Sequence, residues 1–378
     1  MGIKEKMLNG DNNEVVHAAV RICKGYLNGP WKKITPEDIT VKSLSGGLSN
    51  WLFQVKLEKE EAKPQQVLIR LYGQTHGEGA LENLITESVI FTLLSERKLG
   101  PKLYGVFPGG RIEEFIPARP LTQKEMSDPM LNLIVAEKMA AVHTMNIPIN
   151  KEPRWLWDTM NKWLINIDEH PPVTDEQREI FSRNLKAEAI WLRNHLSKIY
   201  SPVVFCHNDL QQGNILRRID QQTTQSSSSA GLVLIDFEYC SYNYRGFDLA
   251  NHFIEWMYDY TNPEYPHFYV NKENYCSIEQ MQKFIERYLN SLNANGSVGK
   301  PEVNNVPAIM REISHYSLAS HFFWGIWSIV NARVSKIPFG YWEYAKERLN
   351  TYYKLKADIL EGSKENTAVK RKVREVDD

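Results

Sequence analysis

Two short apolar runs, each followed directly by polar residues, limit the possible folds of this chain more than any other feature. The first run covers residues 203–206 and leads to Asp209 and Asn214. The second covers residues 232–235 and ends at Asp236. Runs of this length and composition predict buried strands. We therefore expect the two strand ends to bring these three polar side chains to one edge of the fold.

The order of the polar residues is typical of phosphoryl transfer. In kinases one carboxylate accepts the proton of the substrate hydroxyl, while an Asn and a second Asp hold the Mg²⁺ ions that bridge the nucleotide phosphates. The pattern His207-x-Asp209-x4-Asn214, followed later by Asp236-Phe237, has this order. A single Asp or Asn at a strand end is more typical of a turn or a cap. The joint spacing instead predicts Asp209 as the catalytic base and Asn214 and Asp236 as metal ligands.

The same segment carries a resemblance to a known family. Residues 207–214 and 235–238 resemble the motif of the choline/ethanolamine kinases, which are related to aminoglycoside phosphotransferases and protein kinases. The continuation over residues 239–260 is similar to choline kinases in particular, and the resemblance extends over residues 39–353. It implies an α+β, protein kinase-like fold with two lobes: a small antiparallel-sheet N-lobe and a large, mainly helical C-lobe.

The resemblance also implies a division of the chain. We expect an N-terminal helical segment over residues 1–35. Within it, residues 14–27 carry apolar side chains at helical spacing, and this face is expected to serve packing or a dimer contact. The nucleotide-binding N-lobe should cover residues 36–120, and the catalytic, choline-binding C-lobe residues 121–360. The tail over residues 361–378 is charged and is expected to be disordered, because such a composition cannot form a core.

Strands are predicted over residues 39–41 and 51–57, and the loop between them is the candidate phosphate-binding loop. Its glycines leave the backbone N–H groups accessible to phosphate oxygens. A Gly-Gly pair alone is more typical of a hairpin turn, so this assignment depends on the position of the loop and on the resemblance. The loop comprises Ser45, Gly46, Gly47, Leu48, Ser49 and Asn50.

Arg70 and Glu87 are further candidates for nucleotide binding. Arg70 lies on a predicted strand over residues 66–72, where protein kinases carry a phosphate-binding lysine and the resembling family carries arginine. A helix is predicted over residues 81–96. It places Glu87 as the expected ion-pair partner of Arg70, with Glu82 as the alternative.

A hairpin over residues 102–107 and 111–116 completes the predicted five-stranded sheet. Glu114, Phe115 and Ile116 then lie where kinases place the hinge, whose backbone N–H and C=O groups bind adenine. Backbone recognition constrains the side chains little, so the particular hinge residues stay open.

Helical patterns dominate the predicted C-lobe over residues 130–145, 155–167 and 175–200. His143 is more typical of a core or capping residue than of a catalytic one. Asp248 is expected to cap the helix that it precedes and, as in kinase-like folds, to brace the backbone of the catalytic loop.

Trp324 and Trp327 are three residues apart and share one face of a predicted helix. Spacing alone makes such a pair typical of a core. The resemblance implies instead an aromatic pocket for a quaternary ammonium, a cation that donates no hydrogen bonds and is held well by ring faces and a nearby carboxylate. The implied pocket uses the rings of Tyr260, Trp324, Trp327, Phe339 and Tyr344 and the charge of Glu255.

Composition excludes several other functions. The 378 residues carry a net charge of −1, so no overall field attracts nucleic acid or acidic membranes. The most apolar run, residues 321–330, is half of the roughly 20 residues needed to span a bilayer, and the N-terminus lacks a secretory signal. Four scattered cysteines without C-x-x-C spacing argue against zinc or disulfides and fit a cytoplasmic protein. The resemblance further implies a homodimer.

The expected function is ATP-dependent phosphorylation of the hydroxyl of choline, giving phosphocholine and ADP, the first step of phosphatidylcholine synthesis by the CDP-choline route. It requires ATP and Mg²⁺. Ethanolamine kinase, or a dual choline/ethanolamine kinase, is the alternative within the class. A non-catalytic nucleotide- or choline-binding protein on a kinase scaffold is the alternative from another class. A protein kinase is disfavoured, because Asp236-Phe237-Glu238 lacks the third-position Gly.

Overall fold

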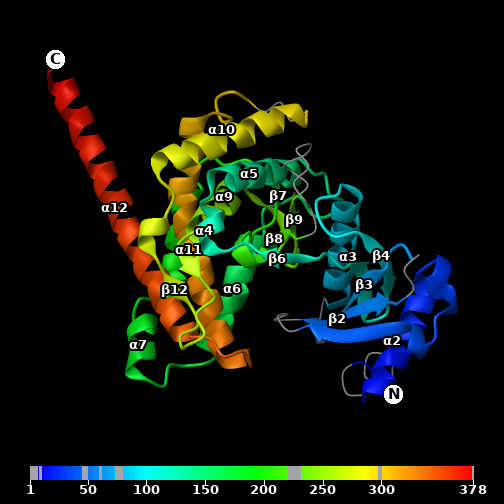
Figure 1. Cartoon of the computed structure of the whole chain (residues 1–378). Helices are drawn as coiled ribbons and strands as arrows, with labels where there is room; N and C mark the ends of the chain where they lie inside the picture. The colour runs from blue at the N-terminus through cyan, green and yellow to red at the C-terminus, as the bar shows by residue number, and fades with distance from the viewer. Residues whose placement is uncertain are drawn as a thin grey trace. The chain divides into compact units, whose positions relative to one another are not determined.

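A computed structural model describes residues 7, 11–44, 50–58, 62–72, 80–219, 231–296 and 300–376 of the chain, without the side chains of residues 50, 80–83 and 362–376. The chain divides into two compact units, and Figure 1 shows the helices and strands that they contain. Unit 1 comprises Met1–Pro120 and Ile215–Glu238, and unit 2 comprises Leu121–Asn214 and Tyr239–Asp378.

The main sheet of unit 1 has five antiparallel strands. They are β1 (Ile39–Leu44), β2 (Asn50–Leu57), β3 (Gln66–Tyr72), β4 (Leu103–Phe107) and β5 (Gly110–Glu114), in the spatial order β1-β2-β3-β5-β4. Alternation explains the strands: in β3, Val67, Ile69 and Leu71 are fully buried, while Leu68 and Arg70 between them are partly exposed. The predicted five-stranded sheet is therefore confirmed.

Two helices accompany this sheet. They are α2 (Asn12–Tyr26) and α3 (Ala80–Glu96), with 3-10 turns at Gly29–Lys33 and Pro36–Asp38. Asp11 caps α2 by accepting a hydrogen bond from the backbone N–H of Glu14 (2.9 Å). Ala19, Ile22 and Cys23 of α2 belong to the same hydrophobic core as the strands. The helix predicted over residues 14–27 therefore has a packing role in unit 1.

A second, three-stranded sheet completes unit 1. It consists of β6 (Ala118–Pro120), β8 (Ile215–Arg218) and β9 (Leu232–Leu234), in the order β6-β8-β9. We expected the segment around β8 and β9 to belong to the larger lobe. It groups with unit 1 because β8 pairs with β6 and because Phe237 packs on Phe91, with ring centroids 5.9 Å apart. Strand pairing between such distant segments leaves no local sequence signal.

Unit 2 is mainly helical. Its helices are α4 (Gln123–Met126), α5 (Pro129–His143), α6 (Trp155–Asp168), α7 (Asp175–Phe181), α8 (Leu185–Leu196), α9 (Arg245–Glu255), α10 (Ile278–Ala294), α11 (Val306–Val334) and α12 (Tyr341–Val376), with 3-10 turns at Gln212–Asn214 and Lys272–Asn274. Two short antiparallel pairs join β7 (Val203–Cys206) to β10 (Ser241–Tyr244) and β11 (Tyr258–Asp259) to β12 (Tyr269–Val270). The mainly helical lobe is therefore confirmed.

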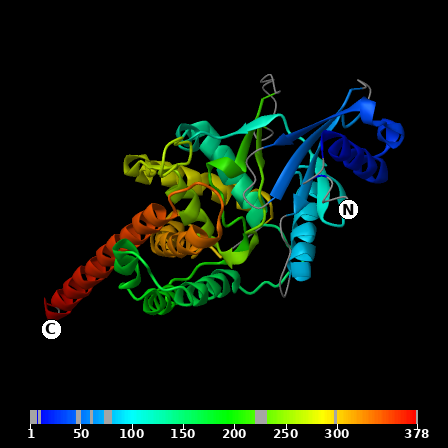
Figure 2. The ribbon, with the colours of Figure 1, turned by 90° about the horizontal axis from the view of Figure 1, so that it is seen from below.

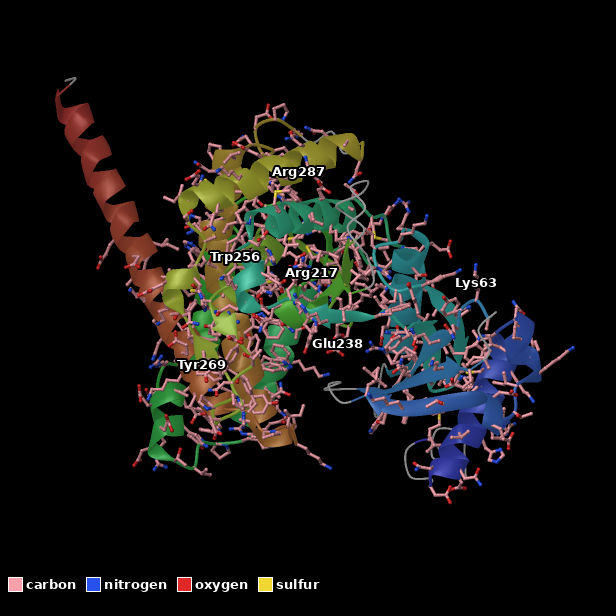
Figure 3. The ribbon with its side chains drawn as sticks, in the orientation of Figure 1. Lys63, Arg217, Glu238, Trp256, Tyr269 and Arg287 are labelled. Atoms are coloured by element: carbon pink, nitrogen blue, oxygen red, sulfur yellow. The ribbon has the colours of Figure 1, made fainter. Side chains whose placement is uncertain are left out.

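Helix α11 occupies the core of this unit, since it contacts α6, α8, α9, α10 and α12. At the surface, Arg287 on α10, labelled in Figure 3, forms an ion pair with Glu137 on α5. The helix pair α5 and α10 is thereby joined at its solvent side as well as through its apolar faces.

Two parts of unit 2 differ from the sequence-based expectation. The predicted helix over residues 175–200 is divided into α7 and α8 at Asn184, which has a left-handed φ of 49° and caps α8 through the N–H of Ala187 (3.2 Å). Asn tolerates this conformation better than most residues. In addition, α12 continues to Val376, through the tail for which we expected disorder. This part of the chain is rich in Lys, Glu, Arg and Ala, which are strong helix formers.

Figures 1 and 2 both show the C-terminal part of α12 extending away from the other helices of unit 2. This helix is long, but it carries many charged residues. None of the helices in the described part of the chain combines the length and the apolar character that a membrane-spanning helix requires.

Candidate active site

The loop after β7 is held by a buried carboxylate. Asp248 accepts hydrogen bonds from the backbone N–H of His207 (2.9 Å) and of Asn208 (2.7 Å), and its Oδ2 lies 2.9 Å from Nε2 of His143. Burial raises the pKa of Asp248, but the hydrogen bond and charge of His143 and the bonds from His207 outweigh burial and hold it below its usual value. The expected brace is confirmed. Asp248 is, however, not the cap of α9, since it lies in the first turn of that helix.

Asn208 fixes the backbone just before Asp209. Its φ is 68°, in the left-handed region. Its Nδ2 donates to the carbonyl of Tyr239 (2.8 Å) and to Oγ of Ser241 (2.9 Å), and its Oδ1 accepts from Nδ2 of Asn243 (2.8 Å). Such a strained conformation persists only where the surroundings determine it fully, which is common at functional sites.

Asp209 and Asn214 lie together in unit 2, as the spacing predicted. Nδ2 of Asn214 donates to the backbone carbonyl (2.8 Å) and to Oδ2 of Asp209 (2.9 Å). These two bonds assign the amide orientation, so Oδ1 is the atom of Asn214 that can bind a cation. The pair therefore combines an oriented carboxylate with an oxygen ligand suitable for a hard metal ion.

Asp236 lies in unit 1, after the end of β9. It is half-buried and has a left-handed φ of 63°. The next residue, Phe237, is buried against Phe91, and its ring lies where a side chain at Gly100 would otherwise stand. The buried Phe237 thus anchors the backbone at Asp236, which has a strained φ and is itself only half-buried.

The ion pairs around Arg70 correct the predicted pairing. Nε of Arg70 contacts Glu113 (3.0 Å), whereas Glu87 pairs with Nη1 of Arg111 (2.7 Å). Arg111 also contacts Glu113 (3.1 Å), so the four residues form one chain from Glu87 to Arg70. Burial raises the pKa of Glu113, but the two arginines outweigh it and the pKa is lowered. Nothing in a strand's alternation distinguishes Glu113 from a surface residue, so sequence reasoning missed it.

The other candidate nucleotide-binding residues are placed only in part. Glu114 accepts from Nη2 of Arg218 (3.2 Å) and from the N–H of Lys102 (3.1 Å). Phe115 and Ile116 follow β5 and connect it to β6. Ser45, Gly46, Gly47, Leu48 and Ser49 lie outside the described residues, as does Glu82 in its side chain, and Asn50 is described only as the first backbone position of β2.

The two tryptophans of α11 are joined to polar partners. Nε1 of Trp324 donates to Oδ1 of Asn251 (2.7 Å), and Nε1 of Trp327 donates to the hydroxyl of Tyr239 (3.2 Å). The two indole rings are 5.4 Å apart, and the ring of Tyr239 is 5.6 Å from that of Trp324. Trp324 is buried and Trp327 is partly exposed. Tyr239 directly follows the Asp236 motif and was missed as a member of this group.

The remaining predicted pocket residues adjoin this group in unit 2. Tyr341 lies between Trp327 (5.9 Å) and Phe339 (5.0 Å), and Phe339 lies near the rings of Tyr344 (5.5 Å) and Tyr260 (6.4 Å). The structure therefore brings the five implied rings into one continuous aromatic region, and Tyr341 is an addition to it.

Glu255 lies beside this region but is not free. It is buried and forms an ion pair with Arg348, and it accepts a hydrogen bond from the hydroxyl of Tyr260 (2.8 Å). Arg348 is ninety-three positions away in sequence, so no local pattern could have paired the two.

Comparison with known proteins agrees with this arrangement. The sequence profile of choline/ethanolamine kinase matches residues 41–353. A choline/ethanolamine kinase of Homo sapiens is 42% identical over 362 residues, covering 94% of this chain and 90% of that protein. Choline kinase alpha of Mus musculus is 42% identical over 365 residues, covering 89% and 80%. A solved choline kinase of Cryptosporidium parvum Iowa II has a TM-score of 0.74 at 28% identity, covering 92% and 97%.

An antiparallel-sheet unit, a mainly helical unit and a braced loop with paired Asp and Asn define a phosphotransferase of protein kinase-like fold. The chain belongs to the choline/ethanolamine kinase family. It is an enzyme that transfers a phosphoryl group to an alcohol, and membership of a kinase family implies ATP as the donor. The family predicted from the catalytic motif is confirmed.

Proposed function

We propose that this enzyme transfers the γ-phosphoryl group of ATP to the hydroxyl of choline, yielding phosphocholine and ADP. The observation that carries the proposal is the aromatic region around Trp324 and Trp327, which continues through Tyr341 to Phe339. Ring faces suit a trimethylammonium group, whose charge is spread over methyl groups that cannot donate hydrogen bonds.

The catalytic roles follow from chemistry and from the loop geometry. Asp209 orients the choline hydroxyl and accepts its proton, and Asn214 holds the Asp209 carboxylate by its amide N–H (2.9 Å). Mg²⁺ is assigned to the side-chain oxygens of Asn214 and Asp236, because a hard cation prefers oxygen ligands. When bound there, Mg²⁺ supplies positive charge against the phosphate oxygens.

The nucleotide is assigned to unit 1 residues. Arg70 binds phosphate, and the backbone of residues 45–50 cradles it. Glu87 supports this site through Arg111 (2.7 Å) rather than by direct contact with Arg70. Glu114, Phe115 and Ile116 offer backbone groups to adenine. The resemblance to the family is the support for these assignments.

A cytoplasmic homodimer is the proposed form of the enzyme. The four cysteines, Cys23, Cys206, Cys240 and Cys276, are all buried free thiols, which suits a reducing compartment. The dimer is proposed from the family resemblance, and sedimentation of the purified protein tests it.

The test of the function is acceptor-dependent ADP release by the purified full-length protein with ATP and Mg²⁺. We expect a higher kcat/KM with choline than with ethanolamine. A higher value with ethanolamine makes the protein an ethanolamine kinase. Absence of acceptor-dependent release with either alcohol, together with nucleotide binding, makes it a non-catalytic binding protein.

A further inference from the structure

Glu255 belongs to a closed ring of hydrogen bonds in unit 2. Nη2 of Arg348 donates to Oε1 of Glu255 and to the hydroxyl of Tyr344. The hydroxyls of Tyr344 and Tyr260 are 2.9 Å apart, and the hydroxyl of Tyr260 donates to Oε2 of Glu255 (2.8 Å). Four side chains from α9, α12 and the segment after β11 therefore close one circuit around the carboxylate.

The chemistry of the groups sets the direction of every bond in this ring. A guanidinium only donates and a carboxylate only accepts. Because the Tyr260 proton is used toward Glu255, the proton between the two hydroxyls comes from Tyr344. The Tyr344 oxygen in turn accepts from Arg348. Both tyrosine protons are thereby committed within the ring, and each oxygen of Glu255 accepts one hydrogen bond from it.

Arg348 also neutralises the charge of Glu255. It is fully buried, and its guanidinium lies 3.9 Å from the centroid of the Tyr258 ring and 4.9 Å from that of Tyr344. In the described part of the chain, Nε and Nη1 of Arg348 have no hydrogen-bond partner, so Nη2 alone serves the ring. Glu255 is only 3% exposed. A small ammonium ion that needs hydrogen-bond acceptors therefore meets a carboxylate that is already bonded and paired.

The two tyrosines and the arginine of the ring keep their protons near neutral pH. Burial is the main cause that raises the pKa values of Tyr260 and Tyr344 well above their usual value. Burial lowers the pKa of Arg348, but the neighbouring tyrosines and Glu255 outweigh burial, so that the pKa is raised. The protons of Tyr260, Tyr344 and Arg348 that form these hydrogen bonds therefore stay bound near neutral pH.

We propose that this circuit of hydrogen bonds is a selectivity device: by bonding each oxygen of buried Glu255 and pairing its charge with Arg348, it disfavours primary ammonium groups and leaves the aromatic faces to bind fully N-methylated amino alcohols. The proposal rests on the proposed function, since it concerns the ammonium side of the same site. Tyr260 has a double role in it, as an aromatic face and as the group that occupies Oε2. Tyr344 and Arg348 are positioning residues that complete the circuit.

Tyr260→Phe tests this role because it keeps the ring face and frees Oε2 of Glu255. One hydrogen bond to a charged group contributes about 1.5–3 kcal/mol, and partial recovery of it by a primary ammonium corresponds to roughly a fivefold to tenfold change in a rate ratio. We expect kcat/KM for ethanolamine relative to choline to rise by about that factor.

Two matched variants separate this effect from loss of a hydroxyl. Tyr344→Phe removes a hydroxyl from the same ring but leaves Tyr260 bonded to Glu255, so the ratio should change less. Tyr352→Phe removes an equally long tyrosine–carboxylate bond, to Glu188 (2.8 Å), elsewhere in unit 2, and should leave the ratio unchanged. Melting temperatures of all three variants identify any loss of folding.

A measurement on the unaltered enzyme supports the test if a variant does not fold. Methylammonium, dimethylammonium, trimethylammonium and tetramethylammonium are compared as inhibitors competing with choline, and affinity should increase along the series. Wild-type activity with choline is established first, because its absence refutes the proposed function instead. If choline is phosphorylated but Tyr260→Phe leaves the ratio unchanged, or methylammonium binds as tightly as tetramethylammonium, the selectivity role is overturned.

Discussion

At the scale of single residues, the contact between Asn214 and Asp209 determines what a conservative change does. In Asp209→Asn the new amide can still accept the hydrogen bond from Asn214 (2.9 Å in the native pair), but it cannot accept the proton of the substrate. General-base catalysis contributes about 10²- to 10⁴-fold, so kcat should fall by that order while ATP binding persists. Steady-state kinetics with nucleotide titration measure both. A kcat near the native value removes Asp209 from the mechanism.

The two tryptophans of α11 should not behave alike. Trp324 is 6% exposed and is bonded to buried Asn251, so Trp324→Ala should lower the stability of the fold by about 3–5 kcal/mol. Trp327 is partly exposed, and loss of its ring should mainly raise KM for choline, several-fold, because one ring contributes roughly 0.5–2 kcal/mol to holding the cation. Denaturant unfolding beside kinetics separates the two. Equal losses of stability would assign both rings to the core.

Residue spacing predicted much of this site, for a physical reason. Asp209 and Asn214 are five positions apart on one loop, so their contact is local and the pattern specifies it. The pairing of Glu113 with Arg70, or of Arg348 with Glu255, joins segments that are distant in sequence. Such pairs depend on the assembled fold, and the sequence-based prediction of an Arg70–Glu87 pair was accordingly wrong.

At the scale of elements, β3 and β5 share a buried charge network. Glu113 is 1% exposed and contacts both Arg70 and Arg111. Glu113→Gln leaves Arg70 without its carboxylate partner, while Arg111 keeps its ion pair with Glu87. Removing one partner of a buried ion pair destabilises a fold by about 3–5 kcal/mol. Because Arg70 loses its orientation, KM for ATP should rise more than KM for choline.

Glu58→Gln, at the position directly after β2, is the control for that change, since the ion pair of Glu58 with Lys56 (3.6 Å) is solvent-exposed and should contribute little. Equal rises in both KM values for Glu113→Gln would indicate general damage to the fold. No rise in either would mean that Arg70 keeps its position without Glu113.

Helices and strands could be predicted where the spacing of apolar residues within the segment identified them. The strands of the main sheet and helices α3, α5 and α6 followed from alternation and helical spacing. The division of the segment over residues 175–200 did not follow, because helix-forming residues continue on both sides of it. Helix α7 ends at Phe181, and Asn184, with its left-handed φ, is the N-cap of α8. The three-stranded sheet was missed because β6 and β8 are brought together by the fold rather than by a turn.

At the scale of the whole molecule, buried neutral histidines should limit stability in acid. Nδ1 of His252 lies 3.0 Å from the carbonyl of Leu210, and its Nε2 accepts from Nε1 of Trp256 (3.3 Å), a residue labelled in Figure 3. Burial lowers the pKa of His252 from 6.5 to about 4, against the opposing hydrogen bond to Leu210. Protonation of Nε2 would also remove the acceptor for Trp256.

The sign of the pH dependence follows from this shift. Below about pH 6.5 the unfolded chain binds a proton at His252 that the folded chain does not bind until about pH 4, so stability falls as pH decreases through this window. The shift corresponds to roughly 3 kcal/mol. Thermal unfolding between pH 7 and pH 4 should show the decline, and His252→Gln should reduce its slope. An identical slope in that variant would assign the acid sensitivity to other groups.

Unit 1 is assembled from two stretches of chain, Met1–Pro120 and Ile215–Glu238, that are separated by part of unit 2. The strand β6 from the first stretch finds its partner β8 in the second. No uninterrupted piece of coding sequence therefore specifies either unit. A genetic exchange with one crossover after Pro120 would combine β6 of one parent with β8 of another, so it would join mismatched strands within a single sheet.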